Sequence, residues 1–127
     1  IHSGTSTFPS AKSRYGDPMY VDDVAVDHPD LKILLAHGGR PLWCDTAFFL
    51  ARHHRNLYID ISSIPPKRLL AYFPRIEEIG DKVVFGSDWP GPGVPGIREE
   101  IEAVRALRVS AEFLENLFIR NAANVFH

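Results

Sequence analysis

The chain has 127 residues, of which 45% are hydrophobic and 24% are charged, which is typical of a folded globular domain and excludes a disordered or low-complexity segment. The formal net charge of -2 at pH 7 provides no basic surface for nucleic acid or for an anionic membrane, so we expect a small-molecule partner. A single cysteine excludes an internal disulfide, and no apolar run approaches the roughly 20 residues that cross a bilayer, so a cytoplasmic location is expected.

The start of the chain, Ile1-His2-Ser3-Gly4, contains no initiator methionine and resembles the inside of a strand. We therefore expect a part of a longer protein.

The first predicted helix covers residues 18–28, with Asp17 as its cap, and it ends before Pro29. A strand is predicted next, at residues 31–36 (LKILLA).

The middle of the chain repeats this alternation of helix and strand. A helix is predicted from Pro41 to residue 55, followed by a strand at 56–61 (NLYIDI). A further helix at 65–80 precedes a third strand at 81–86 (DKVVFG). The strands begin 25 residues apart, which is about the length of one strand and one helix, and their continuous apolar character is typical of strands covered on both faces.

Helices are also predicted at 97–107 and at 110–118, the second capped by Ser110, with one or two helical turns at 121–126. Strands alternating with helices at this spacing predict a parallel α/β fold with right-handed crossovers. The pattern alone is compatible with a closed barrel and with an open sheet. We expect one partial domain over residues 1–127, without a linker or a second domain.

Metal-capable side chains occur where the predicted strands end. His2 follows an apolar first residue, His37 follows the first complete strand, and Asp88 comes two residues after the third. Ser62 and Ser63 follow the second strand. Sites in parallel α/β proteins are built at this edge of the sheet, because the loops after the strands converge there. Imidazole and carboxylate also suit zinc and similar metals.

Each of these residues also has a structural interpretation. A histidine at a strand end is often only a loop residue, and an aspartate after a strand is often the cap of the next helix. Capping explains Asp88 poorly, because the next helix is not expected before about Gly96. Asp60, inside the second strand, is expected to make a structural polar contact.

Four segments of the chain resemble the C-terminal half of the amidohydrolase-related family of metal-dependent hydrolases: DLKILLAHGGR, NLYIDIS, DKVVFGSDWP and RNAANVF. The resemblance implies a (β/α)₈ TIM barrel, of which this chain would supply about strands five to eight. It also implies that His2 and Asp88 bind a divalent metal, zinc being expected, and that His37 is a catalytic residue.

The chain departs from the family pattern in one respect. Members carry a His-x-His pair on strand one that supplies two further ligands, and the six histidines here include no such pair. His53 and His54 are adjacent on a predicted helix and point in different directions, so they are no replacement. A metal held by His2 and Asp88 alone would bind weakly, because such sites use three or four protein ligands.

The resemblance implies a mechanism in which Asp88 takes a proton from water as the water attacks a carbonyl carbon. His37 would hydrogen-bond the water or the developing oxyanion, or act as the proton donor. Arg40 would bind a substrate carboxylate, unless it is only an exposed loop arginine. Trp89 would line the pocket or close the barrel.

Three functions are compatible with these residues. The first is hydrolysis of a C–O or C–N bond in a small carboxylate, lactone or amide. The second is non-oxidative decarboxylation of an aromatic acid at the same site. The third is an inactive fragment, or a half-barrel that pairs with a second copy or with a complementing N-terminal half, because an open arc of strands leaves two edges unpaired.

Overall fold

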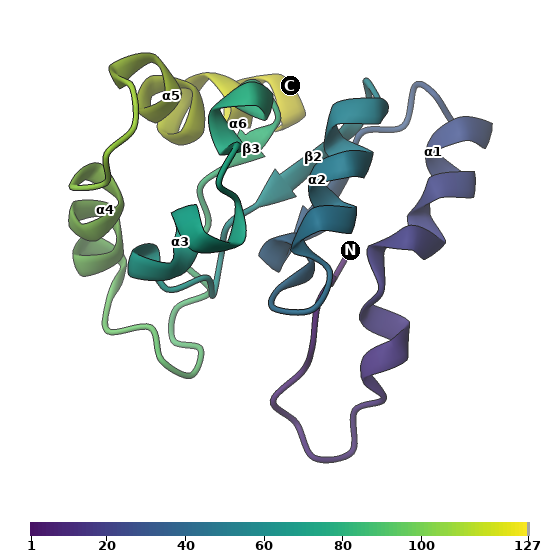
Figure 1. Ribbon diagram of the computed structural model, residues 1–127, viewed down its shortest axis with the longest axis horizontal. Helices are drawn as coiled ribbons and strands as arrows, with labels where there is room; N and C mark the ends of the chain where they lie inside the picture. The colour runs from purple at the N-terminus through teal and green to yellow at the C-terminus, as the bar shows by residue number, and fades with distance from the viewer. Residues whose placement is uncertain (127) are drawn as a thin grey trace.

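A computed structural model describes residues 1–126 (Figure 1). Three parallel strands form its sheet in the order β1-β2-β3: β1 is Ile33–Ala36, β2 is Leu57–Asp60 and β3 is Val83–Val84. Ala36 pairs with Asp60, and Asp60 pairs with Val84. His2 forms an isolated parallel bridge with Ala36, so the first residues extend the sheet beyond β1. The predicted parallel α/β fold is confirmed.

The helices alternate with the strands as predicted, although several are shorter or divided. They are α1 Asp22–Asp27, α2 Cys44–His53, α3 Pro66–Tyr72, α4 Ile97–Arg105, α5 Ala111–Glu115 and α6 Asn121–Phe126. Short 3₁₀ turns occupy Ser13–Gly16, Pro18–Val21, His37–Gly39 and Ile76–Ile79, and a π-helical turn, Asn116–Arg120, joins α5 to α6. No helix within residues 1–126 is long and apolar enough to cross a membrane.

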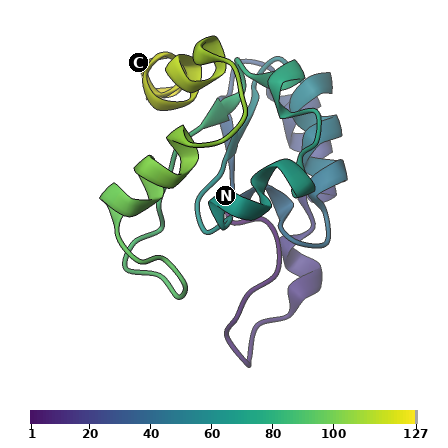
Figure 2. The same ribbon diagram turned by 60° about the vertical axis from the view of Figure 1, so that its left-hand side comes forward.

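The core lies between the sheet and the helices that pack on one of its faces. Alternate strand side chains are buried, and they contact buried side chains of α2, α3 and the segments near β3; the cluster includes Ile33, Leu35, Leu57, Ile59, Val83, Ala47, Leu50, Leu69, Phe73 and Leu117. The intervening strand residues are only half-buried and belong to the opposite face. Figures 1 and 2 show α1 and α2 at one side of the molecule and α4 to α6 at the other.

Two predicted caps are present. The Asp17 side chain accepts a hydrogen bond from the Met19 amide at 2.9 Å, at the start of the turn that leads into α1. The Ser110 hydroxyl accepts one from the Phe113 amide at 3.1 Å, at the start of α5. Both contacts are local in sequence, which is why the sequence predicts them.

The predicted start of the second helix at Pro41 is wrong. This helix, α2, begins at Cys44, because the chain before it forms a loop. Arg40 is extended, with ψ 151°, and its carbonyl accepts a hydrogen bond from the Thr5 amide at 2.9 Å. A contact with a distant segment thus overrides the local preference of proline for a helix start.

The predicted helix at 65–80 is interrupted. Helix α3 ends at Tyr72 and a separate 3₁₀ turn follows at Ile76–Ile79. Pro74 lies between them, and proline has no amide hydrogen to continue a helix. The strand predicted at 81–86 is likewise reduced to the two residues of β3.

Candidate functional site at the carboxyl edge of the sheet

The candidate site lies just beyond the last paired row of the sheet. This row consists of His2, Ala36, Asp60 and Val84, which are side by side because of the parallel register. Each strand continues past it into a loop that carries a polar side chain. The loops at residues 5–12 and 87–96 extend from the same end of the molecule (Figures 1 and 2). The predicted convergence of the strand ends is confirmed.

Three loop residues at this edge share an uncommon backbone conformation. His37, Ser63 and Asp88 have φ values of 69°, 54° and 61°, and no other non-glycine residue between residues 1 and 126 has a positive φ. This conformation costs on the order of 1 kcal/mol or more per residue, and it persists where surrounding contacts enforce it. All three sharp turns thus occur within a few residues of the ends of β1, β2 and β3.

His37 contacts the loop after β2. Its Nδ1 lies 2.8 Å from the Ser62 hydroxyl oxygen and 3.1 Å from the Ser62 carbonyl oxygen. The His37 ring also meets the His2 ring edge to face, with centroids 5.0 Å apart and an interplanar angle of 68°. The two histidines implied as functional therefore lie side by side.

Asp60 supports the same loop from inside the sheet. One carboxylate oxygen accepts a hydrogen bond from the Ser62 amide at 2.7 Å, and the other accepts one from the Ser62 hydroxyl at 3.0 Å. Burial raises the pKa of the Asp60 carboxyl, although the two Ser62 hydrogen bonds act in the opposite direction. The expected structural polar contact of Asp60 is confirmed, and it joins Asp60 to His37 through Ser62.

Asp88 makes the equivalent contact with the neighbouring serine. Its carboxylate accepts a short hydrogen bond from the Ser63 hydroxyl. The backbone turns sharply after it, with the Gly91 amide donating to the Asp88 carbonyl at 2.6 Å. Asp88 itself is exposed, so its carboxylate is accessible to a small molecule from solution.

Arg40 links two loops of this edge. Its Nε donates to the Ser63 carbonyl at 2.7 Å and one terminal nitrogen donates to the Thr5 carbonyl at 3.2 Å. Burial lowers the pKa of Arg40, and the charge of Asp88 opposes this effect. Arg40 is thus held beside Asp88 by the backbone of its neighbours. Its predicted role toward a substrate carboxylate stays a prediction.

Trp89 is 55% exposed, next to Asp88 in the loop. Its predicted role in lining a pocket stays a prediction.

Cys44, at the start of α2, is buried, and burial raises the pKa of its thiol to about 11. Cys44 is therefore a protonated thiol at neutral pH, which excludes it as an activated nucleophile.

His53, the last residue of α2, and His54, which follows it, lie away from this edge. The Nε2 atom of His54 is 2.7 Å from the Asp22 carboxylate, and the rings of His53 and His54 are nearly perpendicular, at 80°. As predicted, the two rings point in different directions. His54 fastens the end of α2 to α1.

The side chains at the carboxyl edge are of the types that bind divalent metals, but too few of them lie together within residues 1–126 to hold one. Partial desolvation lowers the pKa of His2, and the nearby His37 lowers it further, which favours the neutral imidazole that binds metals. Asp88 is close enough for its charge to oppose these effects. However, residues 1–126 contain no group of three or more His, Cys, Asp or Glu side chains arranged to hold a metal ion. His2 and Asp88 fit as two of the ligands of a larger set.

Several residues of this network were not identified as functional from the sequence. Ser62 and Ser63 were noted only for following a strand. Ser3 is almost fully buried, and its hydroxyl donates to the Ala36 carbonyl at 2.8 Å and accepts from the Gly39 amide at 3.0 Å. These serines have one recognisable signal, their place directly after a strand or before a glycine turn, but the residues that they contact depend on the register of the sheet.

Comparisons with known proteins agree with this architecture. The sequence matches the amidohydrolase family model Amidohydro_2 over residues 1–127. No curated protein matches it. Among solved structures, the chain is similar to an uncharacterized TIM-barrel protein, Bb4693 from Bordetella bronchiseptica, with a TM-score of 0.79 and 24% sequence identity. The match covers 98% of this chain and 43% of that protein, so the chain has the fold of part of a TIM barrel.

Proposed function

Because this chain belongs to the amidohydrolase family, we propose that it supplies half of the active site of a metal-dependent hydrolase that acts on a small carboxylate, lactone or amide. One observation carries the proposal. His2, His37 and Asp88 come from three different strand ends and lie at the same edge of a parallel sheet, where α/β enzymes place their catalytic groups.

His2 and Asp88 would hold the metal, together with ligands from outside this set. A divalent metal such as zinc, when bound, supplies Lewis-acid activation of water and of a carbonyl group. The chain's own part is to present a neutral imidazole and a carboxylate from rigid strand ends. Ser3 fixes the segment that carries His2, because its hydroxyl joins the first residues to the end of β1.

Asp88 is the proposed general base. Its carboxylate is exposed, carries a hydrogen bond from Ser63 on one oxygen, and is next to the cationic Arg40. The ionised carboxylate would accept a proton from water and later return it to the leaving group.

His37 and Arg40 are proposed to bind the substrate. His37 lies beside His2 and is half-buried, so it would contact the reacting carbonyl or the water. Arg40 has two nitrogens engaged with backbone carbonyls, and the rest of its guanidinium would pair with a substrate carboxylate. Trp89, being exposed beside Asp88, would cover the bound substrate.

The test uses the product of the complete gene. Purified protein is analysed for bound metal and is assayed with panels of lactones, amides and aromatic carboxylic acids, following carboxylate release and carbon dioxide release separately. We expect metal-dependent carboxylate release, lost in Asp88→Asn. The matched control is Asp30→Asn, which changes an aspartate that is 95% exposed at the other end of the sheet.

Each alternative outcome assigns a different function. Carbon dioxide release without carboxylate release would overturn hydrolysis in favour of decarboxylation at the same residues. Metal binding unaffected by Asp88→Ala and by His2→Ala would overturn the assigned ligands. Absence of both activities and of metal would support an inactive protein.

A further inference from the structure

The side chain of His37 is held on one side only. Its Nδ1 faces two oxygen atoms of Ser62, the carbonyl oxygen at 3.1 Å and the hydroxyl oxygen at 2.8 Å. Its other ring nitrogen, Nε2, makes no hydrogen bond within the part of the chain that the structure describes, residues 1–126. The two nitrogens of this imidazole are therefore in different environments.

The carbonyl oxygen favours a proton on Nδ1 of a neutral His37. A carbonyl can accept a hydrogen bond but cannot donate one, so its contact with Nδ1 is favourable only when Nδ1 carries the proton. The alternative tautomer would place the Nδ1 lone pair against the carbonyl lone pairs. Nε2 then carries the free lone pair.

The Ser62 hydroxyl also favours a proton on Nδ1, because it donates its only hydrogen to Asp60. That hydroxyl is 3.0 Å from one Asp60 carboxylate oxygen, and an ionised carboxylate only accepts. With its hydrogen donated to Asp60, the Ser62 oxygen is left as an acceptor toward His37. The direction of donation is thus from His37 to Ser62 and from Ser62 to Asp60.

The position of Asp60 in this chain is fixed by its surroundings. Its other carboxylate oxygen accepts from the Ser62 amide at 2.7 Å, and the register aligns Asp60 with Ala36, the residue before His37. Gly86 lies directly against the Asp60 carboxylate: a Cβ atom added at Gly86 would be 2.9 Å from the Asp60 Cγ. The carboxylate has little freedom to turn away from Ser62.

We propose that Ser62 and Asp60 are positioning residues that hold neutral His37 as its Nδ1-protonated tautomer, with the Nε2 lone pair free at the candidate site. This inference rests on the proposed function for its catalytic meaning. It decides between the roles that the family resemblance leaves open for His37. A neutral imidazole in this tautomer accepts a hydrogen bond or a proton at Nε2, and it donates from Nε2 only after taking up a proton.

The test is the tautomer itself, measured in the protein from the complete gene without added metal. Long-range ¹H–¹⁵N correlation spectra of protein labelled with ¹⁵N-histidine distinguish Nδ1-protonated from Nε2-protonated rings, and the spectrum of His37→Gln assigns the signal. We expect the Nδ1-protonated pattern in the wild type. Ser62→Ala keeps the backbone carbonyl and removes the shorter hydroxyl contact, so it should lower the share of the Nδ1-protonated form, and Ser62→Thr, which keeps the hydroxyl, should restore the wild-type pattern.

Two further variants separate the network from a general loss of structure. Asp60→Asn introduces an amide that can donate to the Ser62 oxygen, so we expect an increased share of the Nε2-protonated form. Ser63→Ala removes the adjacent hydroxyl, which contacts Asp88 and not His37, and should leave the His37 tautomer unchanged. In a hydrolase assay, Ser62→Ala should lower kcat about 10- to 100-fold with a small change in KM, as for other residues that orient a site histidine.

The Nε2-protonated pattern in the wild type would overturn the proposal, as would an unchanged pattern in both Ser62→Ala and Asp60→Asn. Because the spectra require no turnover, a wrong tautomer and a missing hydrolase activity are separate results. The expected tautomer in a protein that hydrolyses nothing would retain the positioning role and reject only the proposed reaction.

Discussion

The two ends of the same three strands differ in what their key polar side chains contact. At the carboxyl edge, His37 and Asp88 lie in left-handed turns and contact serine side chains of another loop, Ser62 and Ser63. At the amino end, the side chains of the buried Asn56 and Asn121 donate only to backbone carbonyls. The two asparagines hold the fold together, whereas His37 and Asp88 keep atoms free for chemistry.

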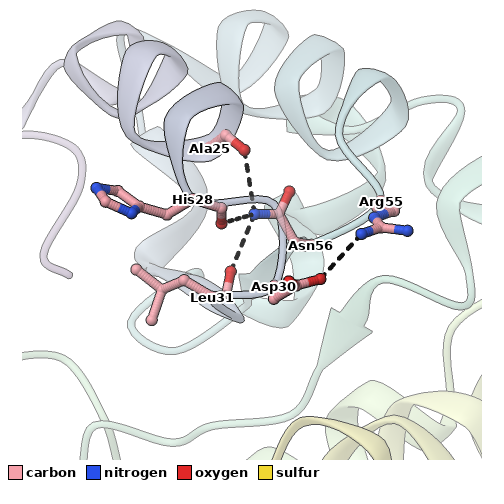
Figure 3. Close-up of polar contacts among 6 residues, drawn as sticks. All are labelled: Ala25, His28, Asp30, Leu31, Arg55 and Asn56. Carbon is pink, nitrogen blue, oxygen red and sulfur yellow. Dashed lines mark hydrogen bonds and ion pairs between the residues drawn. The ribbon is translucent and has the colours of Figure 1, made fainter.

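Asn56 shows the structural use most clearly. It is 6% exposed, and its side-chain amide lies 3.3, 3.0 and 3.0 Å from the carbonyl oxygens of Ala25, His28 and Leu31 (Figure 3). Asn121 does the same at the other side of the sheet, donating to the Gly80 and Val83 carbonyls at 2.8 and 2.7 Å. Each asparagine fastens a loop or helix to the start of a strand.

The largest expected effect is on activity at the carboxyl edge. Asp88→Asn should lower kcat/KM about 10²- to 10⁴-fold, because the amide cannot accept the proton of water. The free energy of unfolding should change little, since Asp88 is exposed. Steady-state kinetics and urea denaturation of the protein from the complete gene measure both. A loss of stability as large as the loss of activity would remove the contrast between the two ends.

At the amino end we expect the reverse, a loss of stability without a loss of activity. Asn56→Ala removes the side-chain donor from the carbonyls of Ala25, His28 and Leu31, of which, within residues 1–126, only that of His28 also accepts from a backbone amide, and should lower the free energy of unfolding by about 2–3 kcal/mol. The folded fraction should retain its kcat, because Asn56 contacts none of the site residues. Asn124→Ala, which changes an exposed asparagine, is the control for urea denaturation. A reduced kcat in Asn56→Ala would contradict the comparison.

Gly86→Ala tests whether the packing around the Asp60 carboxylate affects His37 at the candidate site. The added methyl would press on the Asp60 carboxylate, so we expect a loss of about 1–2 kcal/mol of stability together with a shift of the His37 tautomer. Gly96→Ala is the control, since its added carbon meets only the flexible end of the Glu99 side chain. An unaltered tautomer in a destabilised Gly86→Ala would show that His37 does not depend on Asp60.

A smaller effect concerns the pH dependence of stability. Because the folded-state pKa of Asp60 is raised above 3.8, the folded state binds a proton more tightly than the unfolded chain. The contribution of Asp60 to stability should therefore be greatest below 3.8 and should decline as the pH rises toward its folded-state pKa. Urea denaturation across this range should show the decline in the wild type and not in Asp60→Asn. A parallel pH profile for both would contradict it.

The smallest effect is expected at the surface of the amino end. Arg55 and Asp30 form an ion pair at 3.0 Å, with side chains 75% and 95% exposed (Figure 3). Asp30→Asn should change the free energy of unfolding by no more than about 0.5 kcal/mol, because water and salt screen such a pair. A larger change, measured by urea denaturation, would mean that exposed pairs also hold this end together.

Much of the fold follows from local signals. The three apolar runs became strands, and Asp17 and Ser110 became caps, because each depends on residues within one or two turns of the chain. The helix start at Pro41 failed because Thr5, far away in the sequence, binds the Arg40 carbonyl. The predicted strand lengths were also wrong. For example, β3 pairs with β2 only at Val83 and Val84, and the next amide, that of Phe85, donates to the Leu117 carbonyl instead.

The sequence by itself determined the α/β class, the family and the edge at which the polar residues gather, because side chains that directly follow parallel strands must meet at one edge. Only the tertiary structure decided which of them touch. The register that aligns Ala36 with Asp60 places Ser62 against His37, and the left-handed turns aim His37 and Asp88. Those contacts join residues from different strands, so no local pattern in the chain encodes them.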